Sequence, residues 1–592
     1  MTQEQPQKHH TDSAAPAAPK KKPNMYALLG RYSRYILMLV VLALLSNGIN
    51  LIIPKIISYG IDSFSSHSLD FKLLMLAFGG SALGIFVFTY LQSVVQTIAS
   101  EKVARDLRSN LSEKIARQTF GYIEKVSPGK LLTNLTSDVD AVKSFIAKAI
   151  PVIISSLFLI IGAAILLLTI NWRLGLAVLA IIPIICFAFF FVMVRIKVLF
   201  KKSQEVIDWL NRVISESILG AALIRVLNAQ QPEYQKFVDA NKESLSLGMS
   251  ILKLFATLIP IVVFVSNLAL LVVLALGGHY VIKDAMTLGD FAAFNSYIAL
   301  LIFPILLIGF MSNVIARSSA SYERIHEVLE APPEAETGAL TQPLQGGIAV
   351  DGVSLRYGDK WALKGVSFTV EPGSRTAIIG PTAAGKTQLF YLLTGLTTPD
   401  EGKIRFDGQL LSAYDRKHFH NQVGLVFQDS ILFNTTLREN IAFNQLVSDE
   451  DMERAIATAE LKSFVDGLPQ GLDTEVSERG TSLSGGQKQR VMLARALAIN
   501  PRILLLDDFT ARVDMQTEQK ILQNVKNNYP GITLLSITQK IEPVQDYDQI
   551  ILLMQSELIA KGTHRSLMKS SPEYNQIQQS QRSTSSYELQ SL

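Results

Sequence analysis

Six long apolar runs fill most of the first half of the chain. They lie at residues 36–57, 71–98, 146–170, 174–194, 251–280 and 291–315. Each run is poor in charge and long enough to cross about 30 Å of hydrocarbon as a helix. Lipid offers the backbone no hydrogen-bond partners, so runs that cross it must be helical. The pattern therefore predicts an α-helical transmembrane domain of six spans over residues 25–330.

The polar connections between these runs alternate between short and long. The two long connections, at 101–148 and 195–253, hold nine Lys or Arg each. The three short connections together hold two, Arg173 and Lys283. Because basic loops stay in the cytoplasm, we expect the long connections, both chain ends and the second half of the chain on that side. The long connections are too polar for lipid, so they are predicted to continue the helices into the cytosol.

Composition also points to a protein that lies partly in lipid. Apolar residues make up 48% of the chain and charged residues 18%, which is unusual for a soluble protein of this length. The net charge of +4 lies mostly in the inner connections and gives no case for nucleic-acid binding. The single cysteine, Cys186, falls in an apolar run, so an intrachain disulfide and a cysteine metal cluster are both excluded.

The second half of the chain carries a phosphate-binding loop. It reads Gly380-Pro381-Thr382-Ala383-Ala384-Gly385-Lys386-Thr387. In this pattern backbone N–H groups cradle phosphate, Lys386 reaches the β and γ phosphates, and Thr387 offers its hydroxyl to Mg²⁺. The loop therefore predicts binding of ATP with Mg²⁺. We interpret Ala383 and Ala384 as tolerated variation at unconstrained loop positions.

Two further motifs follow the phosphate loop. The first reads Leu483-Ser484-Gly485-Gly486-Gln487 and precedes a helical run. The second is an apolar strand at 503–506 that delivers Asp507 and Asp508 at its carboxyl end, where open α/β sheets bind ligands. In this order, the three motifs resemble the nucleotide-binding domain of ABC transporters. The resemblance implies an α/β P-loop ABC nucleotide-binding domain over 346–570, fused through a linker at 331–345 to the six-span helical domain.

The resemblance also assigns roles to single residues around the nucleotide. Tyr357 is implied to stack on adenine. Gln428 is implied to sense Mg²⁺ and the attacking water, and Asp507 to organise the Mg²⁺ that Thr387 also binds. These assignments describe a site that holds ATP and its metal ion.

Two positions depart from the family pattern. The family has glutamate where this chain has Asp508, and histidine where it has Gln539. Aspartate is one methylene shorter, so its carboxylate lies about 1 Å from where the base must be, and such a misplacement can cost about 10²-fold in rate. Glutamine can donate a hydrogen bond but cannot become cationic beside the developing phosphate charge. We therefore expect this site to bind ATP more readily than it cleaves it.

The intact signature indicates where hydrolysis takes place. In the family, the signature, here Ser484–Gln487, closes over the ATP of the opposite subunit, and Asp514 matches the loop that contacts across the dimer. The resemblance therefore implies the degenerate half of a heterodimeric bacterial ABC exporter in the plasma membrane. Its partner is a homologous half-transporter with the catalytic glutamate and histidine. A homodimer with slow ATPase, and a lipid flippase or membrane sensor that uses this site as a nucleotide switch, are the alternatives.

The apolar runs have hardly any acid or base at their centres, which favours amphiphilic or apolar cargo such as drugs or lipids. Isolated polar residues in membrane helices form contacts between helices more often than they bind cargo, and this chain has seven notable ones. They are Asn47, Asn50, Gln92, Asn267, His279, Asn295 and Asn313.

The resemblance places short coupling helices at the tips of the cytosolic extensions, near 120–125 and 230–236. Residues 1–24 and 571–592 are rich in polar residues, and both are predicted to be disordered.

Overall fold

The computed structural model describes residues 25, 30–333, 338–429, 431–443, 447–477 and 480–590. The predicted tail at 1–24 lies outside these residues. The chain divides into two compact units. The helical unit comprises the chain up to Ala116 and Ser127–Pro332, and the α/β unit comprises Arg117–Val126 and the chain from Pro333 onward. Arg117–Val126 lies within the predicted transmembrane domain but packs with the α/β unit.

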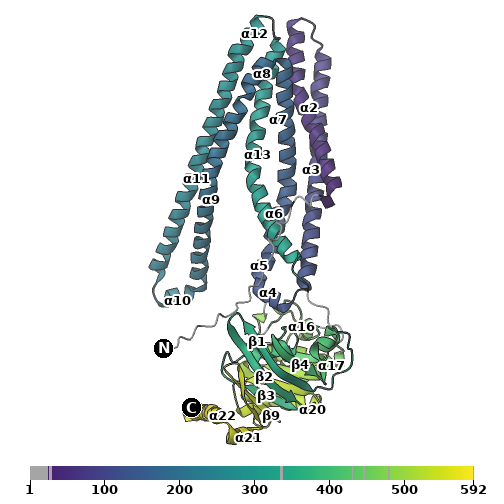
Figure 1. The fold of residues 1–592 in the computed structure, drawn as a ribbon, viewed down its shortest axis with the longest axis vertical. Coiled ribbons are helices and arrows are strands. Elements are labelled where there is room, and N and C mark those ends of the chain that lie inside the picture. The colour runs from purple at the N-terminus through teal and green to yellow at the C-terminus, as the bar shows by residue number, and fades with distance from the viewer. Residues whose placement is uncertain are drawn as a thin grey trace, which may run out of the picture. The chain divides into compact units, whose positions relative to one another are not determined.

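Six helices in the described part of the helical unit are long and apolar enough to cross a membrane, as the apolar runs predict (Figure 1). Some of them are interrupted by a turn or a π-helical segment. Their segments are α2 Ser33–Ser65, α3 Phe71–Ala116, α5 Pro128–Thr133, η1 Asn134–Asp138, α6 Val139–Ser144, η2 Phe145–Ala149, α7 Ile150–Ile170, α8 Trp172–Leu179, α9 Ile181–Leu219, α11 Gln230–Val272, η3 Val273–Gly277, α12 Gly278–Ile282 and α13 Leu288–Leu329.

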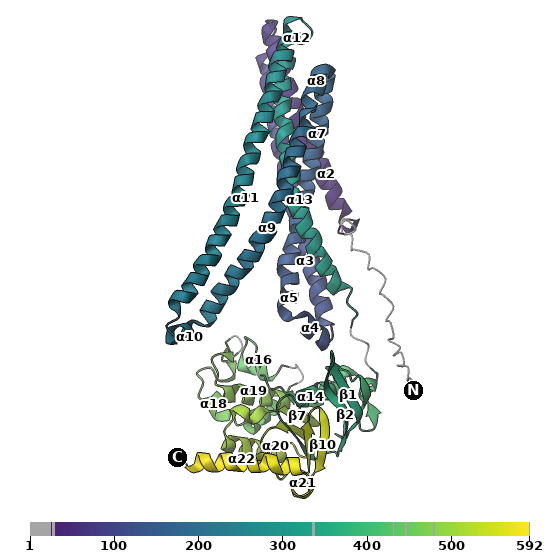
Figure 2. The ribbon, with the colours of Figure 1, turned by 60° about the vertical axis from the view of Figure 1, so that its left-hand side comes forward.

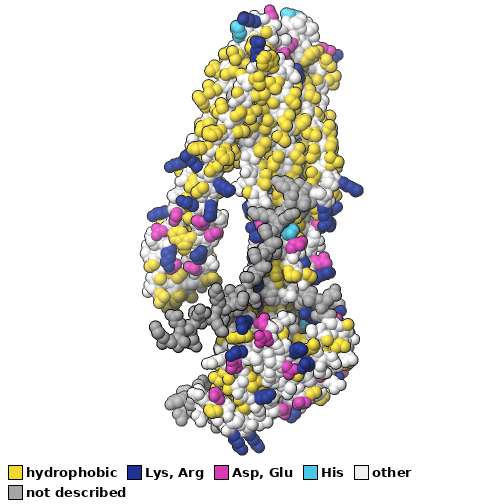
Figure 3. All heavy atoms as spheres, in the orientation of Figure 1, with side chains coloured by type: hydrophobic (Ala, Val, Ile, Leu, Met, Phe, Trp, Pro, Cys, Tyr) yellow, Lys and Arg dark blue, Asp and Glu magenta, His cyan; other side chains and the backbone are white. Residues whose placement is uncertain are grey.

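The helices are longer than a bilayer requires. The 46 residues of α3 span about 70 Å at about 1.5 Å per residue, roughly twice the hydrocarbon thickness. Hydrophobic side chains cover much of the helical unit in Figure 3, and charged side chains gather on the ends of the helices that carry the long connections. The prediction that these connections extend the helices is confirmed for α3, α9 and α11.

Polar side chains inside the helical unit bond mainly to nearby backbone. The Nδ2 atom of Asn47 donates to Ala43 O at 2.7 Å, and that of Asn295 donates to Phe291 O at 3.2 Å, each within its own helix. Tyr297 is fully buried, and its hydroxyl donates to Leu51 O at 2.8 Å, which joins α13 to α2. The Nδ2 atoms of both amides thus bond within their own helices.

An ion pair with one buried partner joins the sixth helix to the polar extension of the third. The Nε atom of Arg324, on α13, donates to Asp138 Oδ2 at 3.0 Å, and Asp138, at the end of η1, is buried. A pair with one buried partner is costly to break, because the carboxylate would be left without its cation.

Short helices lie within the two long connections. One is α4, Phe120–Val126, close to the predicted position 120–125. The other is α10, Ala221–Val226, which lies at the tip where α9 and α11 run side by side in Figures 1 and 2. The predicted position 230–236 is wrong, because those residues begin α11. The chain reverses through a left-handed turn at Asn228, which places the tip before this residue.

The α/β unit contains two sheets. A six-stranded sheet has the order β10-β9-β3-β8-β7-β6, and a four-stranded antiparallel sheet has the order β2-β1-β4-β5. The strands are β1 Ile348–Tyr357, β2 Lys360–Val370, β3 Arg375–Ile379, β4 Glu401–Phe406, β5 Gln409–Leu410, β6 Val423–Val426, β7 Ile503–Asp507, β8 Thr533–Thr538, β9 Gln549–Met554 and β10 Glu557–Gly562.

Helices cover the parallel strands β6, β7, β8, β3 and β9. Every residue of β7 and β8 is buried, as expected for parallel strands between layers of helix. The helices and 3₁₀ turns are α14 Lys386–Leu393, η4 Leu411–Ala413, α15 Arg416–His420, α16 Leu437–Ile441, α17 Asp449–Thr458, α18 Lys462–Asp466, η5 Gly471–Asp473, α19 Gly485–Ala498, η7 Phe509–Arg512, α20 Met515–Asn528, η8 Glu542–Val544, α21 His564–Ser570 and α22 Pro572–Gln590. This arrangement confirms the predicted fold class.

The C-terminal segment differs from its prediction as a disordered tail. It forms α22, which runs along one side of the α/β unit in Figure 2. Tyr574 is fully buried, and Ile577 packs against the core of the unit. These two apolar side chains lie three residues apart on one helical face and attach the start of the helix to the core. The prediction of disorder followed from the polar composition of the rest of the segment and missed the contacts of these two residues with the core.

Candidate nucleotide site

The phosphate loop connects the buried strand β3 to helix α14. Its flanking glycines are required by close backbone contacts. A Cβ atom at Gly380 would lie 2.0 Å from Leu553 O, and one at Gly385 would lie 2.1 Å from Ala362 O. Gly385 also has a φ of +90°, which favours glycine. The loop is therefore held against β9 and β2 at both ends.

The interpretation of Ala383 and Ala384 as unconstrained is wrong for both residues. Ala384 is 2% exposed and belongs to the hydrophobic core. Ala383 has a φ of +65°, a left-handed conformation that costs an alanine about 1 to 2 kcal/mol. One alanine thus packs in the core, and the other carries backbone strain inside the phosphate loop.

Lys386 lies at the start of α14, inside the loop. Its Nζ atom donates to Gly380 O at 2.8 Å and to Pro381 O at 2.7 Å. Burial lowers the pKa of Lys386, and the nearby carboxylates of Asp508 and Asp507 oppose that shift. The ammonium is therefore desolvated and directed at the centre of the loop, where a phosphate would meet it.

Asp507 ends strand β7 and accepts a hydrogen bond from the Thr387 side chain. Burial raises the pKa of Asp507 to about 6, because the Thr387 bond and the Lys386 charge only partly offset desolvation and the neighbouring Asp508. The Asp507 and Thr387 oxygens, together with Gln428, line one pocket. Oxygen ligands of these kinds suit Mg²⁺.

Asp508 and Gln539 face this same pocket from neighbouring strands. Asp508 follows β7 with a left-handed φ of +47°, and its N–H donates to Ile537 O at 3.0 Å. Burial raises the pKa of Asp508, whereas Lys386 and Lys540 lower it. Gln539 directly follows β8.

The structure thus brings most of the predicted nucleotide residues into one pocket of about 240 Å³. The lining comprises Ala362, Thr382, Ala383, Ala384, Gly385, Lys386, Thr387, Gln388, Gln428, Asp507, Asp508, Ile537 and Gln539. Tyr357, Gly380 and Pro381 are outside this lining. Tyr357 is linked to it, because its hydroxyl donates to Gln388 Oε1 at 2.7 Å.

The signature residues form the start of α19. The Ser484 Oγ atom accepts from Gln487 N at 3.3 Å, and Gln487 Oε1 accepts from Ser484 N at 2.8 Å. This capping box uses the Gln487 amide within the helix end. A Cβ atom at Gly486 would lie 2.9 Å from Arg512 O, so the glycine allows the loop after β7 to approach.

These residues open onto a second pocket, of about 540 Å³, that shares no lining residue with the first. Ser484, Gly485, Gly486, Arg490, Arg512, Val513, Asp514 and Thr517 line it. Asp514 also caps α20, since its Oδ1 atom accepts from Thr517 N at 3.0 Å, and backbone hydrogen bonding lowers its pKa. The predicted residues therefore fall into two separate surfaces.

Sequence reasoning missed three residues around these surfaces. Arg512 lies beside Gly485 at the signature pocket. Tyr391, on α14, lies between Phe120 of α4 and Phe427, with ring centroids 5.3 and 6.3 Å apart. Gln581 of α22 bonds to the segment after β8. A cation two residues before Asp514 was visible in the sequence, whereas the other two contacts carry no local sequence signal.

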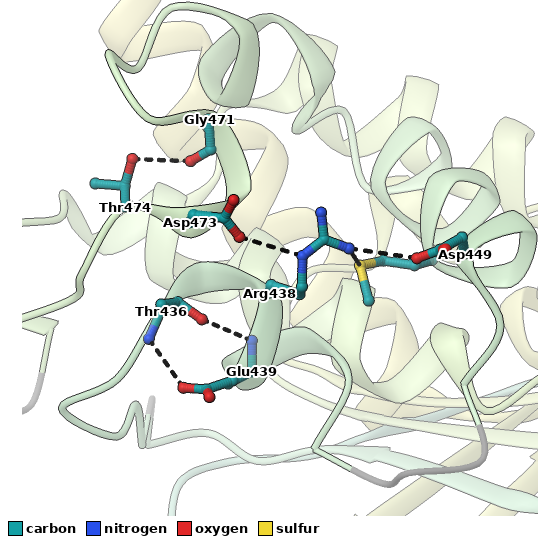
Figure 4. Close-up of polar contacts among 8 residues, drawn as sticks. Thr436, Arg438, Glu439, Asp449, Gly471, Asp473 and Thr474 are labelled. Carbon is teal, nitrogen blue, oxygen red and sulfur yellow. Dashed lines mark hydrogen bonds and ion pairs between the residues drawn. The ribbon is translucent and has the colours of Figure 1, made fainter.

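Side chains of the signature helix α19 bond to Gln428 and to the segment that follows it. The buried side chain of Gln489, on α19, donates to Gln428 O at 3.2 Å. Arg495, also on α19, donates to Asn440 O at 2.7 Å and to Ile431 O at 3.0 Å, and burial lowers its pKa to about 10. Helix α16 is capped by Thr436 and Glu439 in Figure 4.

Arg438 adds exposed contacts to the same cluster. Its guanidinium lies 3.3 Å from both Asp449 and Asp473 (Figure 4). All three side chains are well exposed, so these ion pairs stabilise little. The hydrogen bonds of Gln489 and Arg495, which are more protected from solvent, therefore carry the connection between the Gln428 segment and α19.

Comparisons with known proteins agree with this architecture. The ABC transporter transmembrane region family matches residues 36–305, and the ABC transporter family matches residues 363–511. The chain is 33% identical over 511 residues to the uncharacterized ABC transporter ATP-binding protein YfiB of Bacillus subtilis, covering 85% of this chain and 89% of that protein.

Two other relatives have more specific names. An ATP-dependent lipid A-core flippase of Syntrophus aciditrophicus is 26% identical, with 83% of each chain covered. A multidrug resistance ABC transporter ATP-binding and permease protein of Lactococcus lactis is 28% identical, with 89% of this chain and 90% of that protein covered. The solved structure of a bacterial Atm1-family ABC exporter with ATP bound matches the fold with a TM-score of 0.76 and 24% identity, covering 93% of this chain and 99% of that one.

Proposed function

This chain belongs to the ABC transporter family and is an exporter half-transporter with a translocating ATPase domain. We propose that it is the half of a heterodimeric exporter that carries the degenerate nucleotide site. It moves amphiphilic or apolar small molecules or lipids out of the cytoplasm or the inner leaflet. Its partner is a homologous half-transporter that supplies the catalytic glutamate and histidine. The complex lies in the bacterial plasma membrane, with both termini and the ATPase domains in the cytoplasm.

One observation carries the proposal. Asp508 and Gln539 face the same pocket as Lys386 and Thr387, so the two altered residues lie where they would act on bound ATP. The Asp508 carboxylate is one methylene short of the family's glutamate, and the backbone there is already in a left-handed conformation. Gln539 can donate a hydrogen bond but brings no positive charge. The site retains the groups that bind ATP and lacks those that cleave it.

Three residues would hold Mg²⁺ in this site. They are Thr387 and Asp507, whose side chains already bond to each other, and Gln428, which lines the same pocket. The raised pKa of Asp507 fits this assignment. The raised value means that the buried carboxylate is costly to ionise, and a bound cation would reduce that cost. When bound, Mg²⁺ neutralises phosphate charge. Asp507 would stay ionised beside the ion, and Thr387 would orient that carboxylate.

The signature pocket supports a working site on the partner. Its glycines, the capped start of α19 and the side chains of Arg490 and Arg512 all surround one opening. A helix N-terminus and two guanidinium groups favour an anion. The γ phosphate of ATP bound to the partner is the anion that this surface meets when the two ATPase domains close.

The proposed cycle is alternating access. ATP draws the two ATPase domains together, and the helix extensions that carry α4 and α10 transmit this closure to the membrane helices. Hydrolysis on the partner then resets the transporter, while this chain keeps its nucleotide. The Phe120, Tyr391 and Phe427 rings connect α4 to the segment that holds Gln428.

The experiment is an asymmetry test in the purified complex. Changing the partner's catalytic glutamate to glutamine removes most ATP hydrolysis, whereas Asp508→Asn has a much smaller effect. ATP turnover by the two variants is measured beside the unchanged complex. Equal losses from the two substitutions would show that both sites turn over, and the heterodimer proposal would then fail.

Similarity to a lipid A-core flippase favours lipid, and similarity to a multidrug resistance transporter favours drugs, among the proposed cargoes. The two cargo classes separate in reconstituted vesicles. Lipid transport gives ATP-dependent flipping of a labelled lipid without accumulation of a cationic dye, and drug transport gives the reverse result.

A further inference from the structure

The segment after β8 is held by a side chain from the far end of the sequence. Gln581, on α22, donates from Nε2 to Gln539 O at 2.6 Å. Its Oε1 atom accepts from Ile541 N at 3.0 Å. One primary amide therefore bonds to two backbone groups that flank Lys540. It supplies one donor and one acceptor, as the backbone of a paired strand does.

The position of Gln581 is fixed by the buried anchor of its own helix. The Tyr574 hydroxyl lies 2.8 Å from His564 Nδ1, and its ring is fully buried. Gln578 is 3% exposed one turn further along. Residues 574, 578 and 581 are four and three positions apart, so they share one helical face. The Gln581 amide is thus tied through this face to the core of the α/β unit.

The held segment is the one that carries Gln539 into the nucleotide pocket. Lys540 N donates to Thr538 Oγ1 at 3.1 Å, and Ile541 is 1% exposed. With Gln581 bonded on both sides of Lys540, the backbone at Gln539 is fixed. Removing the amide would leave a buried N–H at Ile541 and free the carbonyl of Gln539 to move.

We propose that Gln581 is a positioning residue of the nucleotide site: it fixes the backbone of Gln539 and so sets the contact of that side chain with the γ phosphate. Helix α22 thereby controls how well the site distinguishes ATP from ADP. This inference rests on the proposed place of Gln539 at the γ phosphate. It does not depend on a second subunit.

The test measures affinity for ATP and for ADP separately. Purified full-length chain in lipid nanodiscs binds trinitrophenyl-ATP, and Mg²⁺ with ATP or ADP displaces it. Gln581→Ala weakens ATP binding by about fivefold, the scale of one or two lost hydrogen bonds, and leaves ADP binding within about twofold. Gln581→Glu is at least as damaging, because its second oxygen faces the carbonyl of Gln539.

The matched control is Gln579→Ala, an exposed glutamine on the same helix, which leaves both affinities unchanged. Combining Gln581→Ala with Gln539→Ala gives no further loss beyond Gln539→Ala alone, since the two residues act through one contact. Thermal unfolding of each variant is measured in parallel.

Three results overturn the inference. Equal weakening of ATP and ADP by Gln581→Ala would make Gln581 a structural contact only. A change in ATP preference with Gln539→Ala but none with Gln581→Ala would leave the role of Gln539 intact and refute the role of Gln581. If Gln539→Ala itself leaves the preference unchanged, the proposed place of Gln539 at the γ phosphate fails as well.

Discussion

Ala383 has a backbone conformation that side chains rarely adopt, and it does so inside the phosphate loop. The sequence identified the phosphate loop because the pattern of glycines, lysine and threonine is specific. It did not reveal the strain at Ala383 or the burial of Ala384, because both depend on φ and on packing against distant strands. At the scale of single residues, the residue types of the phosphate loop could be predicted, whereas the backbone angle of Ala383 and the burial of Ala384 could not.

Replacing Ala383 by glycine relieves this strain. We expect Ala383→Gly to raise the free energy of unfolding of the α/β unit by about 1 kcal/mol, because glycine adopts a positive φ without a Cβ contact. Ala384→Gly is the control with the opposite sign, since it removes a buried methyl group from the core. Thermal unfolding of the two variants checks the pair. A lower melting temperature for Ala383→Gly would contradict the strain argument.

The raised pKa of Asp507 would make the proposed Mg²⁺ site sensitive to pH. Its pKa rises from 3.8 to about 6 through burial, so its ionisation between about pH 4 and pH 6 costs folding stability. A bound cation offsets that cost, and Mg²⁺ must displace the proton as the pH falls below about 6. We expect affinity for Mg²⁺ with ATP to fall by up to about tenfold per pH unit below that point.

Nucleotide titrations at several pH values, with Mg²⁺ or with a chelator, measure this dependence. Asp507→Asn is the control: it weakens binding with Mg²⁺ and retains only the pH dependence of ATP itself. An unchanged pH profile in this variant would show that another group titrates.

At the scale of elements, the six membrane helices were predictable, because runs of apolar residues this long have few other uses in a protein. Short elements were less predictable. The tip helix α10 lies earlier than expected, since the left-handed turn at Asn228 sets where the chain reverses. Helix α22 was predicted to be disordered because its anchor is only Tyr574 and its neighbours. A local composition signal does not report such tertiary contacts.

Arg495 is the element-scale contact with the clearest energetic consequence. It is partly buried and donates to Asn440 O and Ile431 O in the segment that follows Gln428. We expect Arg495→Ala to lower the free energy of unfolding by about 3 kcal/mol, because the buried Asn440 loses hydrogen bonds to both its backbone and its side-chain oxygen. Arg438→Ala, which removes the exposed ion pairs of Figure 4, is expected to cost less than about 1 kcal/mol.

Thermal or denaturant unfolding of the full chain compares the two arginine variants. Similar losses from both would show that the exposed pairs matter as much as the hydrogen bonds of Arg495. A loss confined to Arg495→Ala supports a rigid connection between the Gln428 segment and the signature helix α19.

At the scale of the whole molecule, one chain combines membrane helices and an ABC-type ATPase. The sequence predicted both from independent signals, apolar length in one half and motif order in the other. The proposed function is an asymmetric transporter, and that asymmetry rests on Asp508 and Gln539. These residues can be restored to the family pattern without changing the rest of the chain.

The most direct measurement is steady-state ATP hydrolysis by this chain purified alone, unchanged and with Asp508→Glu and Gln539→His combined. The account predicts that the unchanged chain binds ATP with a turnover far below about 1 s⁻¹, the low end of ordinary enzymes. The double variant should gain about 100-fold, because its base and its cation are restored and a second copy of the same chain supplies an intact signature. A turnover of about 1 s⁻¹ or more by the unchanged chain, or no gain in a double variant that still binds ATP, would contradict it.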